Sequence, residues 1–417
     1  METRLTALKL LCEVFLHQKF ANKLLNQLKQ SQKFSDPDIA FIFKLVYGTI
    51  QYKIYLEYVV NKIIDPQKTD KEVQILLWMS LYQIKFLNTP IYSVTFEGVE
   101  VVKKINKQLA GFVNVKIKAL ADSKLWEVNI KNKQNTLALE NGFPFWLYQH
   151  FKADFGQEIA EKLVLSANQP TLISFRLNLN KISQQDFLAE FQVAHKIEVS
   201  KIAKNAYLAA SSIFTSRAFV DKLIYIQDET SILAVELLNP QPNTKVLDLC
   251  CAPGGKLSYL AQLVGPKTIV TGNEIDVKKQ NLIEQNLNAC QITNVKLSFL
   301  DGRQVKGNFD YIMLDAPCSG WGVFKRKPEI KLKKFTHEAM QSLYQTQAEL
   351  LSHAFGLLND NGKLLYATCT INKAENQNLI TSFLKKEPTA SLLSEEQYFG
   401  FESNNNGFYL ALISKKL

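Results

Sequence analysis

Apolar residues recur at helical spacing through the first third of the chain. Leu8, Leu11, Cys12 and Phe15 follow one another at steps of three, one and three residues, which places them along one face of a helix. Further apolar runs follow, and glycine and proline are sparse within them. The pattern predicts a compact all-helical domain over residues 1–135.

Residues 136–235 combine two kinds of periodicity. Two helical patterns flank a strand-like stretch at 171–180. A small α+β connector is the simplest architecture for this region. Arg176 and Asn178 alternate on the strand-like stretch and could therefore face a nucleic acid.

Strand-like and helical patterns alternate through the rest of the chain. Alternation at this spacing predicts a parallel sheet flanked by helices, in a third domain over residues 236–417. The final apolar run at 407–416 can supply one more strand, paired at an edge of the sheet. The other strand-like runs cover 245–250, 268–276, 295–301, 309–315 and 362–369.

Composition and charge narrow the class of protein. The apolar fraction of 47% and the charged fraction of 21% are typical of a soluble globular protein. The formal net charge is +10, and residues 1–133 hold 20 Lys or Arg against 12 Asp or Glu. Such an excess favours a polyanion partner, although an ordinary solvated surface would also account for part of it.

The location of the protein follows from its cysteines and its apolar runs. The six cysteines show no C-x-x-C spacing, which argues against a structural zinc site or a disulfide scaffold and favours reduced thiols in a cytosol. Lys9 and Glu13 interrupt the first apolar stretch, which argues against a signal peptide. No uncharged apolar run approaches the roughly 20 residues needed to span a bilayer. We expect a cytoplasmic protein with no membrane segment and no metal.

A glycine-containing turn joins the first strand of the predicted sheet to its helix. The turn comprises Cys250, Cys251, Ala252, Pro253, Gly254, Gly255 and Lys256. Glycines let a backbone approach a ligand closely, and the start of a helix offers N–H groups to it. Glu274 ends the next strand, 20 residues after Gly254, where an acidic residue suits a ribose diol.

The motifs of pyrophosphate-binding loops are absent from this turn. It contains neither G-x-G-x-x-G nor G-x-x-x-x-G-K-[ST]. S-adenosylmethionine, with an amino-acid tail and one ribose, fits better, and Asp301 at the third strand end is placed to meet its adenine amine. Acidic residues can also act only as helix caps. That alternative accounts less well for Glu274, Asp301 and Asp315 at three successive strand ends.

Two cysteines follow consecutive strands of the predicted sheet. Cys318 comes just after the strand that ends at Asp315, and Cys369 follows the next strand. Parallel strands lie about 4.8 Å apart and end at the same edge of a sheet, so both thiols should overhang one crevice. A buried cysteine is commonly just a small apolar residue. A pair flanked by Asp315, Pro317 and Thr368 favours a chemical role.

A thiol has a specific use in methyl transfer to a pyrimidine. Carbon 5 of the ring is a poor nucleophile, and addition of a thiolate to carbon 6 enables carbon 5 to attack a methyl sulfonium. A thiol with a pKa of about 8.5 is mostly protonated at neutral pH, so the site must lower that pKa or supply a base, and Lys256 would help. An adenine N6-methyltransferase typically shows a D/N-P-P-Y/F tetrad where this chain reads DAPC, which favours cytosine or uracil.

Together, LDLCCAPGGK, DAPCSGWGVFKRKPEIK and YATCT resemble the motifs of the RNA 5-methylcytosine methyltransferases. The resemblance spans about residues 140–417, and the helical N-terminus resembles the NusB-type RNA-binding domain. Such a combination implies an all-α NusB-like domain, an α+β connector and a Rossmann-like S-adenosylmethionine methyltransferase domain. It also implies methylation of carbon 5 of a cytosine in small-subunit (16S) ribosomal RNA.

The resemblance also implies roles for individual residues. The family's nucleophile maps to Cys369, and the thiol that assists product release maps to Cys318. Asp315 would steady N3 of a base flipped out of its stack, with Lys256 as the fourth catalytic residue. Cofactor binding maps to the turn Cys250–Lys256 and to Glu274, Asp301 and Asp315.

Two other functions stay open at this point. One is a cytosine-5 methyltransferase that acts on a transfer RNA or on another ribosomal site, and the other is a non-catalytic RNA-binding assembly factor. The paired thiols argue against the second. We expect a monomer whose partner is small-subunit ribosomal RNA before its assembly.

Overall fold

The computed structural model describes residues 1–402 and 405–416. The chain divides into two compact units, one of Met1–Gln169 with Phe324–Lys334 and one of Pro170–Val323 with Phe335–Leu417. This division keeps most of the connector with the sheet domain. The boundaries at 135 and 235 therefore stay predictions, and residue 417 lies outside the described part.

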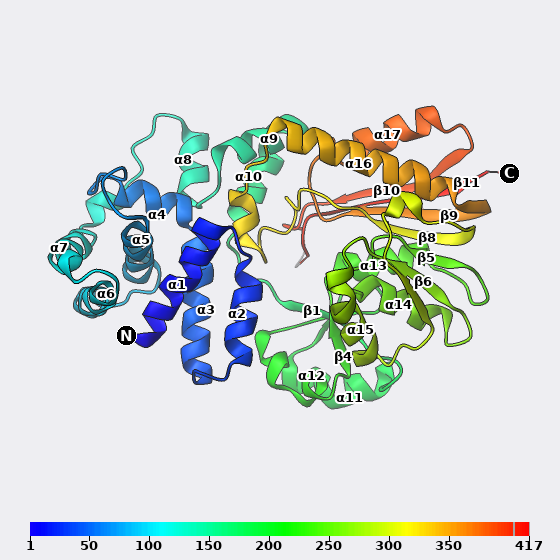
Figure 1. Ribbon diagram of the computed structural model, residues 1–417, viewed down its shortest axis with the longest axis horizontal. Helices are drawn as coiled ribbons and strands as arrows, with labels where there is room; N and C mark the ends of the chain where they lie inside the picture. The colour runs from blue at the N-terminus through cyan, green and yellow to red at the C-terminus, as the bar shows by residue number, and fades with distance from the viewer. Residues whose placement is uncertain (403–404, 417) are drawn as a thin grey trace. The chain divides into compact units, whose positions relative to one another are not determined.

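The first unit is built from helices, as the apolar spacing predicts (Figure 1). In α5 every residue from Val73 to Gln83 is buried, which identifies it as the central helix of the bundle. The helices of residues 1–120 are α1 (Glu2–His17), α2 (Ala21–Gln30), α3 (Asp36–Gln51), α4 (Lys53–Val60), α5 (Lys71–Phe86), α6 (Ile91–Ile105) and α7 (Ala110–Ala119).

Three more helices and a returning segment complete this unit. The helices are α8 (Lys133–Glu140), α9 (Phe145–Phe155) and α10 (Gln157–Ser166). The segment Phe324–Lys334 carries the short 3₁₀ helix η6 (Pro328–Leu332). Its Lys331 is buried and donates a hydrogen bond to the Gln51 carbonyl at 2.7 Å.

The connector folds into a small antiparallel sheet. Its strand order is β2-β3-β1-β4. The strands are β1 (Ile173–Leu177), β2 (Glu198–Val199), β3 (Ala206–Ala209) and β4 (Ile224–Ile226), with helices α11 (Gln184–His195) and α12 (Arg217–Val220) beside them. The strand predicted at 171–180 is present as β1, and the helical pattern predicted after it is present as α11.

The prediction that Arg176 and Asn178 face a nucleic acid is wrong, because both side chains are buried. The Arg176 guanidinium donates hydrogen bonds to Gln227 at 2.9 Å and to Ser258 at 2.8 Å. It also lies 4.9 Å from the ring centroid of Tyr225. These contacts supply neutral partners for a buried cation, so Arg176 joins the connector to the sheet domain.

The second unit contains a seven-stranded sheet in the order β10-β11-β9-β8-β5-β6-β7. Strands β5 to β9 are parallel, as predicted, and β11 pairs antiparallel with both β9 and β10. The strands are β5 (Val246–Asp248), β6 (Val270–Asn273), β7 (Val295–Ser298), β8 (Phe309–Asp315), β9 (Leu358–Thr368), β10 (Ala390–Tyr398) and β11 (Phe408–Lys415). This is a Rossmann-like sheet with an antiparallel strand inserted beside β9.

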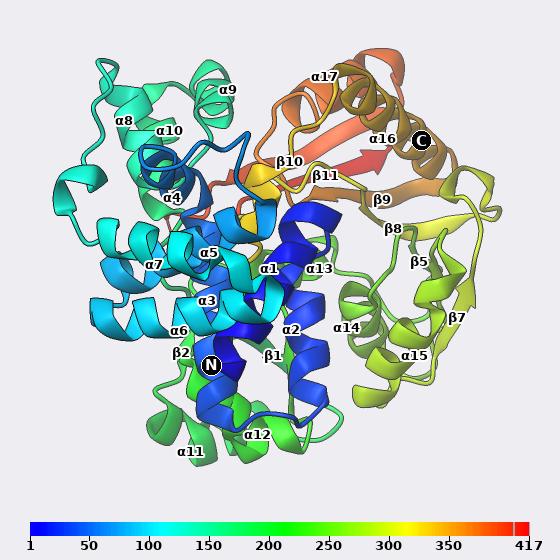
Figure 2. The same cartoon turned by 60° about the vertical axis from the view of Figure 1, so that its left-hand side comes forward.

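Helices cover both faces of this sheet (Figures 1 and 2). One apolar core joins the sheet to α13 (Glu229–Leu238), α14 (Gly255–Val264) and α15 (Gln280–Ala289). A second core joins its other face to α16 (His337–Gly356) and α17 (Gln377–Lys386). The parallel strand ends that carry the candidate site residues therefore lie between two helical layers.

The expected edge position of the last strand is wrong. β11 lies between β9 and β10, and its residues from Phe408 to Ile413 are all buried. The edge strand is β10, which the apolar pattern did not reveal because its middle residues, Leu393 to Glu396, are exposed and mostly polar.

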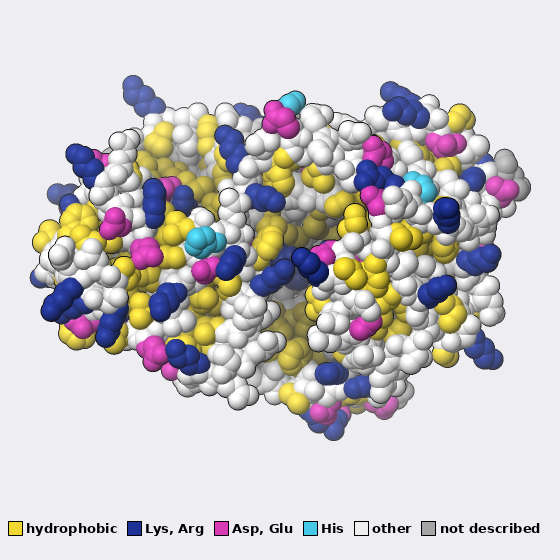
Figure 3. Space-filling model, viewed as in Figure 1, with side chains coloured by type: hydrophobic (Ala, Val, Ile, Leu, Met, Phe, Trp, Pro, Cys, Tyr) yellow, Lys and Arg dark blue, Asp and Glu magenta, His cyan; other side chains and the backbone are white. Residues whose placement is uncertain are grey.

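The surface gives a mixed picture of charge. Figure 3 shows Lys and Arg side chains spread among acidic and apolar ones on the face in view. On this face the basic side chains do not form one continuous patch. Among the described residues, no helix is both long enough and apolar enough to cross a membrane.

Candidate active site

The two thiols meet at the ends of neighbouring strands. β8 and β9 are parallel, with Asp315 paired to Ala367, and the chain continues from these ends to Cys318 and Cys369. Their Sγ atoms are 3.4 Å apart, within hydrogen-bonding distance for sulfur, and both residues are half-buried.

A close backbone approach holds the two thiol loops together. The Gly322 N–H donates to the Cys369 carbonyl at 3.0 Å. A Cβ at Gly322 would lie 2.0 Å from the Gly407 carbonyl oxygen and 2.8 Å from that of Cys369. Only glycine fits at position 322, which explains the second of the two glycines that follow the Pro-Cys motif.

The environments of the thiols differ in a way that bears on their roles. The hydrogen bond with Cys369, followed by burial, holds the pKa of Cys318 well above its usual range. Cys318 therefore keeps its proton at neutral pH and can donate it toward Cys369. Either thiol can be the donor in this contact, and a hydrogen bond donated by Cys318 would stabilise a thiolate on Cys369.

An ion pair lies at the ends of the same strands. Lys256, in the first turn of α14, donates to Asp315 at 2.6 Å. Burial alone would lower the pKa of Lys256, but Asp315 outweighs it and the pKa is raised, with Cys369 acting in the same direction. Lys256 therefore stays a cation in the electrostatic field of the thiol pair.

The glycine-containing turn forms one wall of a pocket that shares this ion pair. Gly254 has a φ of +104° and its N–H donates to the Cys251 carbonyl at 2.7 Å, so the turn needs a glycine before α14 begins. The pocket is lined by Tyr225, Ile226, Gln227, Ser231, Asp248, Cys250, Cys251, Ala252, Pro253, Gly255, Lys256 and Asp315.

Asp248 is a pocket residue that the sequence analysis missed. It is fully buried at the end of β5. Neither carboxylate oxygen accepts a hydrogen bond of ordinary geometry from the described residues, and burial raises the pKa of this carboxyl to about 7. A buried carboxylate without donors suits a ligand that brings its own, such as an ammonium group. The available signal was an acidic residue that ends an otherwise apolar strand.

The two other acidic residues at strand ends have different settings. Glu274 is buried and accepts hydrogen bonds from the Ala252 N–H at 3.3 Å and from Lys279 at 2.9 Å, which ties it to the rim of the pocket. Asp301 accepts from the Arg303 guanidinium at 2.9 Å. Hydrogen bonds from Arg303 lower the pKa of Asp301 to about 2.

The fold and this site define a Rossmann-like methyltransferase that carries paired thiols. The model of the 16S rRNA methyltransferase RsmB/F family matches residues 235–412. The NusB family model matches 1–115, and the RsmF/B-like ferredoxin-like domain model matches 143–207.

Curated relatives cover nearly the whole chain. The probable ribosomal RNA small subunit methyltransferase B of Bacillus subtilis is 32% identical over 394 residues, which cover 92% of this chain and 88% of that protein. The probable enzyme of the same name from Coxiella burnetii is 29% identical and covers 100% of both chains. The chain therefore belongs to the RsmB/F family and is an RNA methyltransferase.

A solved structure agrees with the catalytic part of the fold. The crystal structure of a methyltransferase homolog protein from Pyrococcus horikoshii superposes with a TM-score of 0.61 at 25% identity. The match covers 69% of this chain and 100% of that one.

Proposed function

We propose that this protein uses S-adenosylmethionine to methylate carbon 5 of a cytosine in small-subunit (16S) ribosomal RNA. The observation that carries the proposal is the pair of sulfur atoms, Cys318 and Cys369, 3.4 Å apart at the same strand ends as the Lys256–Asp315 ion pair. Family membership and the names of the curated relatives support the same reaction and the same class of RNA.

The pocket residues fit the cofactor. S-adenosylmethionine supplies an electrophilic methyl group on a sulfonium. The buried carboxylate of Asp248 would accept hydrogen bonds from its ammonium group, since no donor of ordinary geometry in the described residues occupies that place. Glu274 would accept from the ribose hydroxyls and Asp301 from the adenine amine. The turn Cys250–Lys256 would bring its backbone against the ligand.

The two thiols divide the chemistry between them. The Cys369 thiolate would add to carbon 6 of the cytosine, and the electron pair of the 5,6 double bond would form the new bond from carbon 5 to the methyl group, as the bond from that methyl to the sulfonium sulfur breaks and the thioether leaves. Asp315 would hold N3 of the flipped base during addition. Release requires loss of the proton on carbon 5, after which its electron pair re-forms the 5,6 double bond and the Cys369–carbon 6 bond breaks.

Cys318 is suited to remove that proton. Once Cys369 is bonded to carbon 6, it no longer accepts a hydrogen bond as a thiolate or carries negative charge. Both effects raise the pKa of Cys318 in the unliganded protein. Cys318 can then lose its proton to solvent and take the one from carbon 5.

The substrate class is tested with purified RNAs. Methyl transfer from labelled cofactor is measured on unassembled 16S ribosomal RNA, assembled small subunits and transfer RNA, followed by bisulfite mapping of the product. We expect 5-methylcytosine in unassembled 16S RNA, from a monomeric cytoplasmic enzyme. Label confined to transfer RNA would give the chain a different substrate. Cofactor binding without label in any RNA would indicate an assembly factor.

A further inference from the structure

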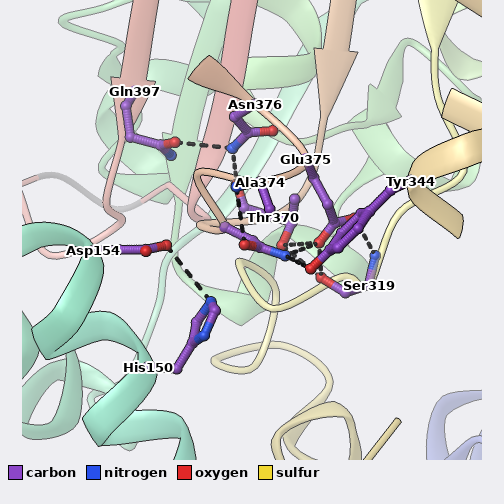
Figure 4. Close-up of polar contacts among 10 residues, drawn as sticks. His150, Asp154, Ser319, Tyr344, Thr370, Ala374, Glu375, Asn376 and Gln397 are labelled. Atoms are coloured by element: carbon purple, nitrogen blue, oxygen red, sulfur yellow. Dashed lines mark hydrogen bonds and ion pairs between the residues drawn. The ribbon is translucent and has the colours of Figure 1, made fainter. Parts of the chain in front are cut away.

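One buried carboxylate lies at the junction of the two thiol loops. Glu375, between β9 and α17, is fully buried. Figure 4 shows the side chains of Ser319, Thr370 and Tyr344 gathered around it. Ser319 directly follows Cys318 and Thr370 directly follows Cys369, so the carboxylate reaches the residue after each thiol.

Glu375 holds the Cys318 loop from both sides. Its Oε2 accepts a hydrogen bond from the Ser319 N–H at 2.8 Å, and its Oε1 accepts from the Ser319 Oγ at 2.6 Å. The Gln347 amide donates to Oε2 at 2.9 Å and also to the Pro317 carbonyl at 2.8 Å. The residues before and after Cys318 are thus linked to one carboxylate.

The same carboxylate holds the Cys369 loop. Its Oε1 accepts from the Asn372 amide at 2.8 Å and from the Thr370 Oγ1 at 3.5 Å. The hydroxyls of Ser319 and Thr370 are 2.7 Å apart, which joins the two loops directly.

The next residue continues the network. Asn376 is fully buried, accepts a hydrogen bond from the Thr368 Oγ1 at 2.7 Å and donates to the Thr370 carbonyl at 3.1 Å. Both neighbours of Cys369 are therefore fixed by the pair Glu375–Asn376, and Figure 4 shows Thr370 beside these two residues.

Stability alone is a poor reason for this carboxylate. Among the described residues the groups that donate to Glu375 are neutral ones of Ser319, Gln347 and Asn372, and a buried charge that has only neutral partners is costly compared with apolar packing. A carboxylate differs from a glutamine in that both of its oxygens accept. A glutamine would turn its NH₂ group toward the donors at one of these two oxygens, so it would lose one part of the network.

We propose that Glu375 is a positioning residue that sets the separation of Cys318 and Cys369. Its role in turnover rests on the proposed division of chemistry between the two thiols. Its effect on the sulfur–sulfur distance is independent of that chemistry, because the distance can be measured in the protein without RNA.

The experiment measures the distance and the turnover separately in the full-length protein. Mild oxidation with diamide converts the two thiols to a disulfide while the diamide is reduced to the hydrazine, and mass spectrometry follows the linked Cys318–Cys369 peptide. In Glu375→Gln we expect the rate of linkage to fall by about tenfold, because disulfides form only within narrow geometry. We expect kcat to fall by about 100-fold, with the Kd for S-adenosylmethionine changed by less than about twofold, because Glu375 is not among the pocket residues.

A matched control breaks a different carboxylate network, on β8. Asp310 accepts hydrogen bonds from the Lys245 N–H at 2.8 Å and from Asn359 at 2.7 Å, at the opposite end of β8 from Asp315. We expect Asp310→Asn to leave both the linkage rate and kcat at the wild-type level. If Glu375→Gln does not fold, Ser319→Ala takes its place. This substitution removes the hydroxyl that contacts Glu375 and Thr370. It should give a smaller loss of the linkage rate and of kcat.

Two results would overturn the proposal. One is wild-type linkage and kcat in Glu375→Gln. The other is an equal loss of cofactor affinity, linkage and kcat, which would make Glu375 a general stabiliser of the fold. A protein that fails to methylate any RNA but loses linkage in Glu375→Gln would refute the proposed function and leave the positioning role standing.

Discussion

One fully buried carboxylate lies in the cofactor pocket and another lies beside the thiol pair. The two differ in the hydrogen bonds that they accept from the protein. Asp248 in the pocket accepts no hydrogen bond of ordinary geometry from the described residues. Glu375 beside the thiols accepts hydrogen bonds from the neutral groups of Ser319, Gln347 and Asn372. An unsatisfied buried carboxylate is costly, and a ligand that donates to it recovers that cost. The comparison teaches that Asp248 is built for a ligand and Glu375 for its own neighbours.

The largest expected effect is on the affinity for S-adenosylmethionine, which should depend on Asp248 and not on Glu375. Asp248→Ala removes a buried pocket carboxylate that accepts no hydrogen bond of ordinary geometry from the described residues, so we expect the Kd for S-adenosylmethionine to rise by about 100-fold, or about 3 kcal/mol. Isothermal titration calorimetry measures it, with Glu375→Gln as the matched variant that keeps its affinity. Equal affinities in wild type and Asp248→Ala would remove the contrast.

A second prediction concerns stability and pH. The folded-state pKa of Asp248, about 7, lies above the unfolded value of 3.8, so the unfolded chain holds fewer protons between those values and stability falls as pH rises through that window. Three pK units correspond to about 4 kcal/mol, and burial of an asparagine amide without partners offsets about half of this.

We therefore expect Asp248→Asn to be more stable than the wild type by about 2 kcal/mol at pH 8 and less stable by about 2 kcal/mol below pH 4, where only the cost of the buried amide is left. Chemical unfolding of both proteins at the two pH values measures the difference. An advantage of the same size at both values would show that Asp248 does not titrate in this window.

A smaller effect is expected from the acidic residues that follow β6 and β7. We expect Glu274→Ala to weaken cofactor binding by about tenfold and Asp301→Ala by about fivefold. Glu274 also supports Ala252 of the turn, whereas Asp301 must share its oxygens with Arg303. Fluorescence or calorimetric titration of both variants checks the order. Unchanged affinity in both would place the nucleoside elsewhere.

The parts of this protein that sequence patterns could predict depend on local periodicity. The alternation after residue 236 predicted the parallel strands, and the rule that parallel strands end at one edge brought Cys318 and Cys369 to the same place. Position in the sheet was harder: β11 was expected at an edge because the exposed, polar β10 gave no strand signal.

Features that depend on distant partners could not be predicted. Arg176 looked like an exposed strand residue, but its partners Gln227 and Ser258 lie 51 and 82 residues away. Glu375 reaches Ser319 across 56 residues, so nothing near it in the sequence marks its role. Asp248 gave a signal, an acid in an apolar strand, but its lack of donors is a property of the folded chain.

The central claim is that Cys369 attacks the base and Cys318 releases it. The direct test incubates each alanine variant with 16S ribosomal RNA and S-adenosylmethionine and separates the products on a denaturing gel. Cys318→Ala can form and methylate the adduct but cannot resolve it, so a protein–RNA band of reduced mobility should accumulate. Cys369→Ala should give no such band. A shifted band from Cys369→Ala and none from Cys318→Ala would contradict the account and assign the attack to Cys318.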